Sequence, residues 1–345
     1  MNTAPAGTHH TLIIGDCTKI LPTLPDRSIA LIVTSLPYFN AEHDYKNYYQ
    51  SYDEYRELLH QVARESIRVL ADGRIFALNI DDMRVDGRLY PLVADATTAF
   101  LKAGYDYRAR ITWVKPKGFA LRQRQSGLAV KYPYPMYPYF SNLTESILLF
   151  QSGKFDYKSV TEQCKQKSRI DKDKWSREWN LNVWNICNVL PVKGRVEENI
   201  AAFPDEIPKR LITLFSYKSE TVLDCFLGSG TTMKIARQLR RNSIGIEIDP
   251  ALEPVIREKT GFAVPNTRPD TFKVIPQKNF TKPYSLSPKQ PQKRRAHAEE
   301  ENGRRQRDEE HPLPVLQRPP LLHTILNGQH GSAAILPNRD RLSLH

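Results

Sequence analysis

The sequence has few cysteines and no long apolar run. Its four cysteines, at positions 17, 164, 187 and 225, form no Cys-x-x-Cys pair, and none has a histidine at zinc-ligand spacing. Neither a disulfide framework nor a zinc site is therefore expected, and we expect reduced thiols, as in an intracellular protein. No segment approaches the roughly 20 apolar residues that span a membrane. The first 16 residues lack a charged segment before their short apolar run, so no signal peptide is expected.

Acidic residues are in the minority. The 345 residues include 38 Asp and Glu against 50 Lys and Arg, a formal net charge of +12. This excess favours a polyanionic partner, with nucleic acid first. An apolar fraction of 40% suffices for a sizeable core, and the length allows one large domain with an insertion and a tail. We expect an intracellular protein of the cytoplasm or nucleoid, or of the nucleus if the source is eukaryotic.

Strand-like and helical patterns alternate along two parts of the chain. In the first part, strands are predicted at 11–16, 29–34, 74–80 and 107–113 and helices at 52–70 and 90–104, with Gly73 as a helix C-cap. In the second part, helices are predicted at 204–215, 231–240 and from 251, and strands at 221–226 and 243–248. This alternation predicts βαβ units and a mainly parallel sheet.

The pattern breaks down between residues 115 and 198. One strand is predicted at 143–150, and most of the rest is interpreted as an inserted, substrate-facing region. Its Tyr-Pro stretch at 132–140 suits either a nucleic-acid-contacting loop or a packed loop. Eight basic side chains are candidates for phosphate contacts: Arg122, Arg124, Lys131, Lys165, Lys167, Arg169, Lys172 and Lys174. From 265 to 345, Pro, Gln, Arg and Glu dominate, which predicts a disordered basic tail.

A glycine turn follows the strand predicted at 221–226. The stretch Asp-Cys-Phe-Leu-Gly-Ser-Gly-Thr-Thr, residues 224–232, opens a helix, and glycine lets backbone approach a ligand closely. No lysine follows Gly230 as in a P-loop, and Met233 replaces the third glycine of a dinucleotide fingerprint. A nucleoside without a pyrophosphate, such as S-adenosylmethionine, is the remaining ligand class. Glu247 ends the next strand, where a carboxylate can accept hydrogen bonds from ribose hydroxyls.

A second polar turn, Ser35-Leu36-Pro37-Tyr38, ends the strand predicted at 29–34. If the ligand is a methyl donor, this turn would hold the acceptor at the same sheet edge. A hydroxyl and backbone carbonyls can accept the N–H bonds of an exocyclic amine, and Tyr38 can stack on a base. Pro37 restrains the backbone. A base in a duplex reaches such a pocket only by flipping out, and catalysis is then mainly positioning for in-line displacement.

Together these segments resemble the DNA amino-methyltransferases that modify adenine N6 or cytosine N4. The resemblance rests on residues 34–38, 198–212 and 224–232, with 13–21 similar to the family's first segment. The catalytic turn precedes the cofactor turn, as in the permuted beta class. The resemblance implies an α/β, Rossmann-like S-adenosylmethionine-dependent methyltransferase fold with a seven-stranded, mostly parallel sheet. The methyltransferase domain would span 11–262, with target recognition in 115–198.

The resemblance also implies roles for individual residues. Ser35, Pro37 and Tyr38 would hold the target amine and base. The cofactor would be bound by Asp16, Phe203, Pro204, Asp224, Phe226, Gly228, Gly230, Thr231, Thr232 and Glu247. Among these, Asp16 would lie near the adenine, Glu247 on the ribose, and Phe203 and Pro204 near the methionine end. Serine in the first position of the catalytic turn is associated with cytosine N4, so that base is expected, with adenine N6 as the alternative.

One position departs from the family pattern. The family usually has Pro-Pro before the tyrosine, whereas Leu36 stands here and leaves φ less restrained, although Pro37 still favours an extended Leu36. Reduced or retained activity is expected. Two other interpretations stay open: a DNA-binding module with an impaired site, and a dinucleotide oxidoreductase, against which the missing third glycine counts. The family implies double-stranded DNA as partner and makes a restriction enzyme a candidate partner. Asp81 and Asp82 are interpreted as a loop, no metal is expected, and the oligomeric state is open.

Overall fold

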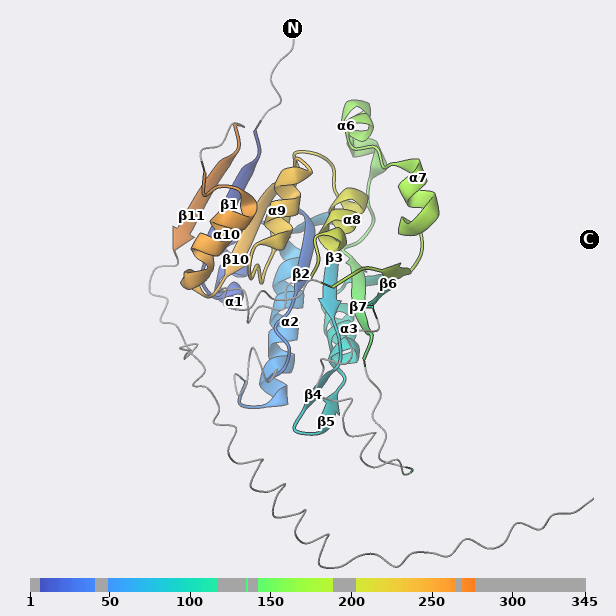
Figure 1. Cartoon of the computed structure of the whole chain (residues 1–345), viewed down its shortest axis with the longest axis vertical. Coiled ribbons are helices and arrows are strands. Elements are labelled where there is room, and N and C mark those ends of the chain that lie inside the picture. Colours follow the sequence, from blue (N-terminus) through green and yellow to red (C-terminus); the bar gives the residue numbers. More distant parts are fainter. Residues whose placement is uncertain are drawn as a thin grey trace, which may run out of the picture. The chain divides into compact units, whose positions relative to one another are not determined.

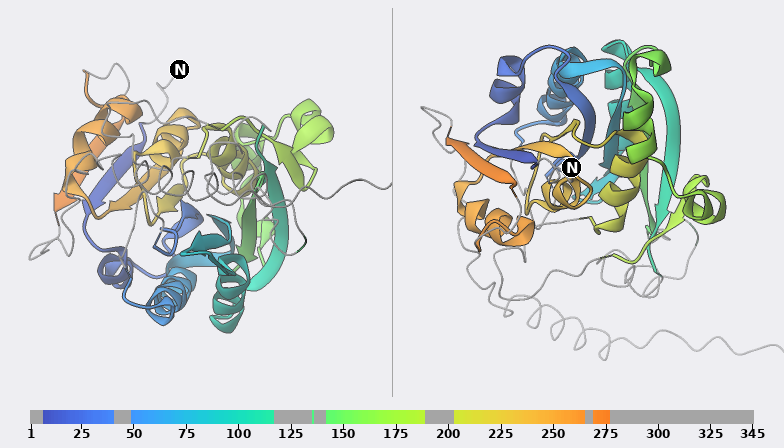
Figure 2. Two further views of the ribbon diagram at one scale, coloured as in Figure 1. Left: turned by 60° about the horizontal axis from the view of Figure 1, so that its bottom comes forward. Right: turned by 90° about the horizontal axis from the view of Figure 1, so that it is seen from above.

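The apolar run Ile29–Ser35 forms strand β2 in the middle of a large sheet. The computed structural model describes residues 7–40, 49–116, 135, 142–188, 203–264 and 269–276. Within them the sheet has nine strands in the order β11-β1-β10-β9-β2-β3-β7-β6-β8, and helices cover both of its faces (Figures 1 and 2). Leu31 and Val33 point into one core and Ile32 into the other. A strand covered on both faces has no polar side, which explains its unbroken apolar run.

All but one of the described strands in this sheet run in the same direction. They are β1 (His9–Ile14), β2, β3 (Leu70–Ile80), β6 (Asp106–Val114), β7 (Thr144–Gln151), β8 (Val183–Asn185), β9 (Thr221–Asp224), β10 (Asn242–Glu247) and β11 (Thr271–Pro276). Only β7, between β3 and β6, is antiparallel to its neighbours. The parallel strands therefore share one carboxyl edge, where ligands bind in open α/β sheets.

Two layers of helices cover the sheet. The helices α1 (Cys17–Ile20), α2 (Tyr52–Val69) and α3 (Leu92–Lys102) pack on one face. The helices α8 (Glu206–Phe215) and α9 (Thr231–Gln238) pack on the other, and α10 (Glu253–Thr260) lies beside α9. The helices bring the chain back from the carboxyl edge to the amino edge, as connections between parallel strands require. No helix within the described ranges is long and apolar enough to cross a membrane.

The strand count and the start of the predicted tail need correction. Seven strands were expected, and β8 and β11 are the additional ones. Because β11 spans Thr271–Pro276, the tail predicted from 265 does not begin there. This strand pairs with β1 along its whole length, and Asp270 just before it accepts hydrogen bonds from Thr8 and Arg237. An edge strand with exposed alternate residues lacks the apolar run that marks a central strand. Residues 277–345 lie outside the described part.

Gly73 is not a helix C-cap. The helix α2 ends at Val69, and Gly73 lies inside β3, where the pairing register with β2 shifts. Its φ is +75°, and a Cβ there would stand 2.1 Å from the Phe155 Cα. The glycine is therefore required by a contact with a segment far along the chain, which helix signals cannot reveal.

The region 115–198 is not one insertion, because β7 belongs to the sheet. After β7 the chain forms η2 (Tyr157–Ser159), α6 (Glu162–Lys167), α7 (Lys172–Lys174) and a π-helix, η3 (Trp175–Trp179). The Lys218 N–H, just before β9, donates to the Ser168 hydroxyl at 2.9 Å. The segment around α6, with Lys165, Lys167 and Arg169, therefore lies at the amino edge of the sheet (Figure 1). Of the other predicted residues in this region, Lys172 and Lys174 lie in α7, whereas Arg122, Arg124, Lys131 and nearly all of 132–140 lie outside the described residues.

Candidate functional site

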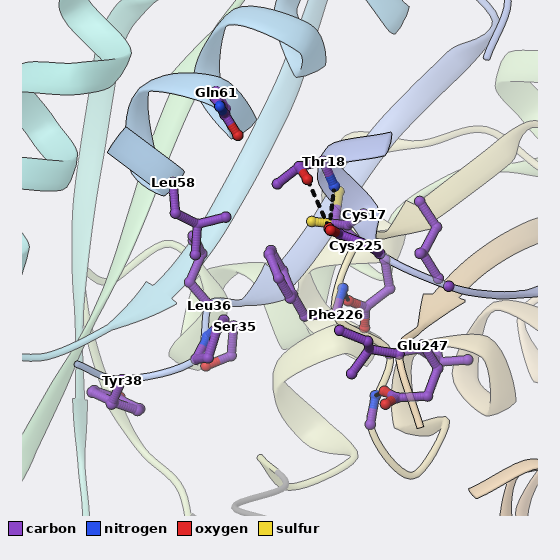
Figure 3. Close-up of a pocket in the computed structure, with 18 of the residues that line it drawn as sticks. Cys17, Thr18, Ser35, Leu36, Tyr38, Leu58, Gln61, Cys225, Phe226 and Glu247 are labelled. Atoms are coloured by element: carbon purple, nitrogen blue, oxygen red, sulfur yellow. Dashed lines mark hydrogen bonds between the residues drawn. The ribbon is translucent and has the colours of Figure 1, made fainter. Parts of the chain in front are cut away.

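A pocket of about 410 Å³ opens at the carboxyl edge of the sheet. Both the glycine turn and the Ser35–Tyr38 turn line it, although about 190 residues separate them. Of the predicted site residues, the lining includes Asp16, Ser35, Pro37, Tyr38, Phe203, Asp224, Phe226, Gly228, Thr231 and Glu247. Pro204, Gly230 and Thr232 are not among the lining residues. In Figure 3, Ser35 and Tyr38 lie on one side of Phe226 and Glu247 on the other.

The glycine turn is fixed by backbone geometry and by two hydrogen bonds to β10. Gly228 and Gly230 have φ values of 55° and 92°, in the left-handed region that favours glycine. The Leu227 N–H donates to the Ile246 carbonyl at 2.9 Å, and the Gly228 N–H donates to Glu247 Oε2 at 2.8 Å. Gly230 then starts α9. At Gly228 the turn thus presents backbone without a side chain to the pocket.

Two buried carboxylates flank this turn. Asp224 Oδ1 accepts hydrogen bonds from the Thr34 hydroxyl at 2.7 Å and from the Phe226 N–H at 3.1 Å. Glu247 also accepts from the Asp249 N–H at 2.8 Å. Burial raises the pKa of Asp224 to about 6 and that of Glu247 to about 7, and hydrogen bonds counteract part of this increase. Glu247 is therefore partly protonated at neutral pH when the pocket is empty.

Asp16 lies at the start of α1 on the pocket wall. Its Oδ1 accepts from the Thr18 N–H at 2.9 Å and from the Thr18 hydroxyl at 2.7 Å, so the carboxylate caps this short helix (Figure 3). The neighbouring Cys17 and the residue after Asp224, Cys225, also line the pocket. Burial raises the pKa of both thiols well above the usual range, so both are protonated and unreactive.

The Ser35–Tyr38 turn is anchored by apolar packing. Leu36 is 1% exposed and belongs to the core beneath α2. The residue that follows the turn, Phe39, packs its ring 5.0 Å from Tyr52 and 4.8 Å from Tyr90. The leucine that replaces the expected proline therefore has a packing role. Its burial in the core supplies part of the rigidity that a second proline would give the turn.

A polar cluster lies behind Tyr38. Burial raises the pKa of the Tyr38 phenol well above its usual range, and the nearby carboxylates of Glu145 and Asp81 raise it further. Glu145 forms an ion pair with Lys115 and accepts a 2.6 Å hydrogen bond from Asn79. The Tyr38 phenol therefore stays neutral at physiological pH.

Burial also raises the pKa of the Asp81 carboxyl to about 7. Asp81 accepts a hydrogen bond from Asn142, and Asp82 accepts one from the Val93 N–H at 3.1 Å, as expected of a loop.

Helix α2 contributes a wall of the pocket that the sequence patterns do not predict. Its Glu54, Glu57, Leu58 and Gln61 line the pocket, and Figure 3 shows Leu58 and Gln61 above the Ser35–Tyr38 turn. Their spacing of three, four and seven residues places them on one helix face. That spacing was available from the sequence, but nothing in the sequence indicates that this face meets the pocket.

The pocket fits an adenosyl ligand in size and chemistry. Its volume is in the range of small-molecule sites. The left-handed glycines allow close approach of the ligand to backbone, and Glu247 offers acceptor oxygens that suit a ribose diol. The apolar side chains of Phe226, Leu227 and Ile246 supply flat and aliphatic walls.

Comparisons with known proteins agree with this geometry. A family model described as DNA methylase matches residues 29–258. The Type II methyltransferase M.MjaI of Methanocaldococcus jannaschii is 33% identical over 289 residues, which cover 74% of this chain and 92% of that protein. The Type II methyltransferase M.MthZI of Methanothermobacter thermautotrophicus is 31% identical over 263 residues, covering 68% and 72%.

Solved structures share the fold. TTHA0409 of Thermus thermophilus, described as a DNA modification methylase and solved with S-adenosyl-L-methionine, matches with a TM-score of 0.61 at 27% identity. The match covers 77% of this chain and 98% of that one. The cytosine-N4-specific PvuII DNA methyltransferase matches with a TM-score of 0.52 at 19% identity over 77% and 91% of the two chains, which bears on the fold alone. The predicted fold class is thereby confirmed.

Proposed function

Because the chain belongs to the DNA methylase family, in its beta class of amino-methyltransferases, we propose that it methylates the N4 amine of cytosine in double-stranded DNA. S-adenosylmethionine is the cofactor of this family. The observation that carries the proposal is the meeting of the two turns in one pocket, with Ser35 and Tyr38 facing the residues around Phe226 and Glu247. The choice of cytosine over adenine rests on the serine at position 35.

Each turn would have a separate task. When bound, S-adenosylmethionine supplies a methyl group on a positively charged sulfur. The glycine turn would accommodate the methionine part, and Glu247 would accept hydrogen bonds from the ribose hydroxyls. Asp16 would lie near the adenine, and Phe203 and Pro204 near the methionine end. These roles are supported by the common pocket that the predicted residues line.

The Ser35–Tyr38 turn would hold the acceptor. The Ser35 hydroxyl accepts a hydrogen bond from the exocyclic amine and turns the nitrogen lone pair towards the methyl group. The neutral Tyr38 ring stacks on the base, and Pro37 keeps the carbonyl acceptors aimed. Once methylated, the amine is cationic and loses a proton readily to solvent, so no strong base is required. The rate gain comes mainly from positioning, and the base reaches the pocket by flipping out of the duplex.

The relatives named above are Type II methyltransferases. We therefore also propose that this chain works beside a restriction enzyme with the same recognition sequence. Methylation by this chain should then make DNA resistant to that enzyme, which a digestion of treated and untreated plasmid would test.

Product analysis tests the main proposal directly. Purified protein is incubated with unmethylated DNA and S-adenosylmethionine, the DNA is digested to nucleosides, and the products are identified by mass spectrometry. N4-methylcytosine is expected, and Ser35→Ala should reduce its formation by about 10²-fold or more, as for loss of a positioned transition-state contact. Ser28→Ala, an exposed position just before the same strand, is the matched control. N6-methyladenine would overturn the base assignment, and no methylated base would overturn the proposal.

A further inference from the structure

A short hairpin leaves the sheet at the same edge as the pocket. Strand β3 ends at Ile80, and β4 (Met83–Val85) and β5 (Arg88–Tyr90) then form an antiparallel pair. Asp86 and Gly87 join them with φ values of 47° and 82°. Two left-handed residues in a two-residue loop are typical of the type I′ turn, the tightest and most regular hairpin connection. The hairpin projects from the carboxyl edge on this defined turn (Figure 1).

The base of the hairpin is fixed to the catalytic turn. The Tyr90 ring lies 4.8 Å from that of Phe39 and 4.6 Å from that of Tyr52. Met83 and Val85 pack against the same core. Phe39 directly follows Tyr38, so the hairpin is held in a defined position relative to the residue proposed to stack on the target base.

The opposite face of the hairpin turns outward. Arg84 and Leu89 are cross-strand partners and lie on one face, whereas Met83 and Tyr90 lie on the other. Leu89 on the outward face is 52% exposed. Arg84 Nη1 donates to the Gly87 carbonyl at 2.7 Å and braces the turn. Arg88 pairs with Val85 and so belongs to the Met83 and Tyr90 face, but at the tip of the hairpin its side chain is exposed, and its guanidinium lies 5.1 Å from the Tyr90 ring centre.

The charge of the hairpin is positive. Between Met83 and Tyr90 there are two arginines, Arg84 and Arg88, and one carboxylate, that of Asp86. Asp86 occupies a left-handed position that few residues other than glycine, asparagine and aspartate tolerate. Turn geometry thus explains Asp86, whereas no packing requirement explains an exposed Leu89 between Arg88 and Tyr90. The basic segment around α6 cannot play the same part, because it lies at the amino edge, away from the pocket.

We propose that the tip of this hairpin is a DNA-contact site that flanks the target base, with Arg88 on a backbone phosphate and Leu89 against the sugars and base edges of the groove. The inference rests on the proposed function, since it takes DNA as the substrate. Arginine suits phosphate geometry, and apolar side chains at a groove contact are common among proteins that distort DNA. The rigid turn lowers the entropic cost of this contact.

Binding of a fluorescently labelled duplex of about two helical turns, followed by anisotropy at several salt concentrations, tests the inference. Arg88→Gln should weaken binding about 3- to 10-fold and lower the slope of log K against log salt by about 0.9, the loss of one phosphate contact. Leu89→Ser should weaken binding about threefold or more without changing the slope. Asp86→Asn keeps a residue that tolerates the turn but removes the negative charge, so it should tighten binding.

Matched controls lie away from the hairpin. Arg64→Gln on α2 and Leu101→Ser at the end of α3 change side chains that are 64% and 47% exposed, and neither should alter affinity or slope. S-adenosylmethionine titration of every variant verifies its fold. Hairpin variants that bind DNA like the unmodified protein would overturn the inference, as would an unmodified protein that does not bind DNA. An unmodified protein that binds DNA but yields no methylated base would refute the proposed function, while the comparison of variants still decides the hairpin.

Discussion

The Thr34 hydroxyl donates a 2.7 Å hydrogen bond to Asp224 Oδ1 and joins the end of β2 to the end of β9. Thr34 immediately precedes the Ser35–Tyr38 turn, and Asp224 begins the glycine turn. The two strands are neighbours in the sheet although about 190 residues separate them. Besides the pairing of the two strands, one buried hydrogen bond therefore ties together the two turns that line the pocket.

Replacing Thr34 by valine should weaken both stability and cofactor binding. The change keeps the side-chain shape but leaves a buried carboxylate with one donor fewer, which costs about 1–3 kcal/mol of unfolding free energy. The pKa of Asp224, already raised by burial to about 6, should rise further. Urea denaturation and S-adenosylmethionine titration measure the two effects. Thr98→Val, at an exposed position on α3, is the control, and equal effects at both positions would contradict the role of this bond.

Cofactor affinity should depend on pH through Glu247. Burial raises the pKa of its carboxyl to about 7, so below that pH the protonated group accepts hydrogen bonds from ribose hydroxyls poorly. Affinity should fall up to about tenfold for each pH unit below about 7, as calorimetric titration from about pH 8 down to about pH 6 would show. Glu247→Gln should bind weakly with a flatter profile. An unmodified protein with a flat profile over this range would contradict the assignment.

The same group should affect the stability of the free protein in the opposite direction. Because its pKa is raised in the folded state, its stabilising contribution is complete below its unfolded value of about 4.3 and is lost as pH rises through about 7. Glu247→Gln should therefore stabilise the cofactor-free protein more at about pH 8 than at about pH 5. Thermal denaturation at the two pH values measures this difference, and a larger gain at the lower pH would show that the sign is wrong.

Leu36→Ala should destabilise the protein by about 2–4 kcal/mol, because it leaves a cavity in a core where this side chain is 1% exposed. Leu36→Met, which conserves volume, should cost less than about 1.5 kcal/mol. Urea denaturation of both variants provides the comparison. If alanine cost no more than methionine, Leu36 would not be a packing residue, and its departure from the family pattern would have another cause.

Gly73→Ala should be far more harmful than Gly87→Ala. Both glycines have positive φ, 75° and 82°, so each substitution carries a backbone strain of about 1–2 kcal/mol. Only at Gly73 would the new Cβ also meet backbone, at 2.1 Å from the Phe155 Cα, whereas nothing lies within 4 Å of it at Gly87. Thermal denaturation should therefore separate the two variants, and similar transition temperatures would contradict the steric argument.

The sequence by itself determined the central strands of the sheet and the two turns that line the pocket. A parallel strand buried on both faces must be apolar along its length, so β2 and β9 are visible in the sequence. The Gly228 and Gly230 turn and the Ser35–Tyr38 turn follow such strands directly. Because parallel strands end at one edge, the meeting of these turns follows from the strand pattern itself, and most predicted site residues line one pocket.

The tertiary structure decided what depends on contacts between distant segments. Edge strand β11 carries no unbroken apolar signal, so only its pairing with β1 reveals it. Gly73 is required by Phe155, and the basic segment around α6 lies at the amino edge because β7 runs against its neighbours and delivers the chain there. Glu145 approaches Tyr38 from another strand. Helix and strand patterns report each residue's own surroundings, whereas these features depend on which segments the sheet order places side by side.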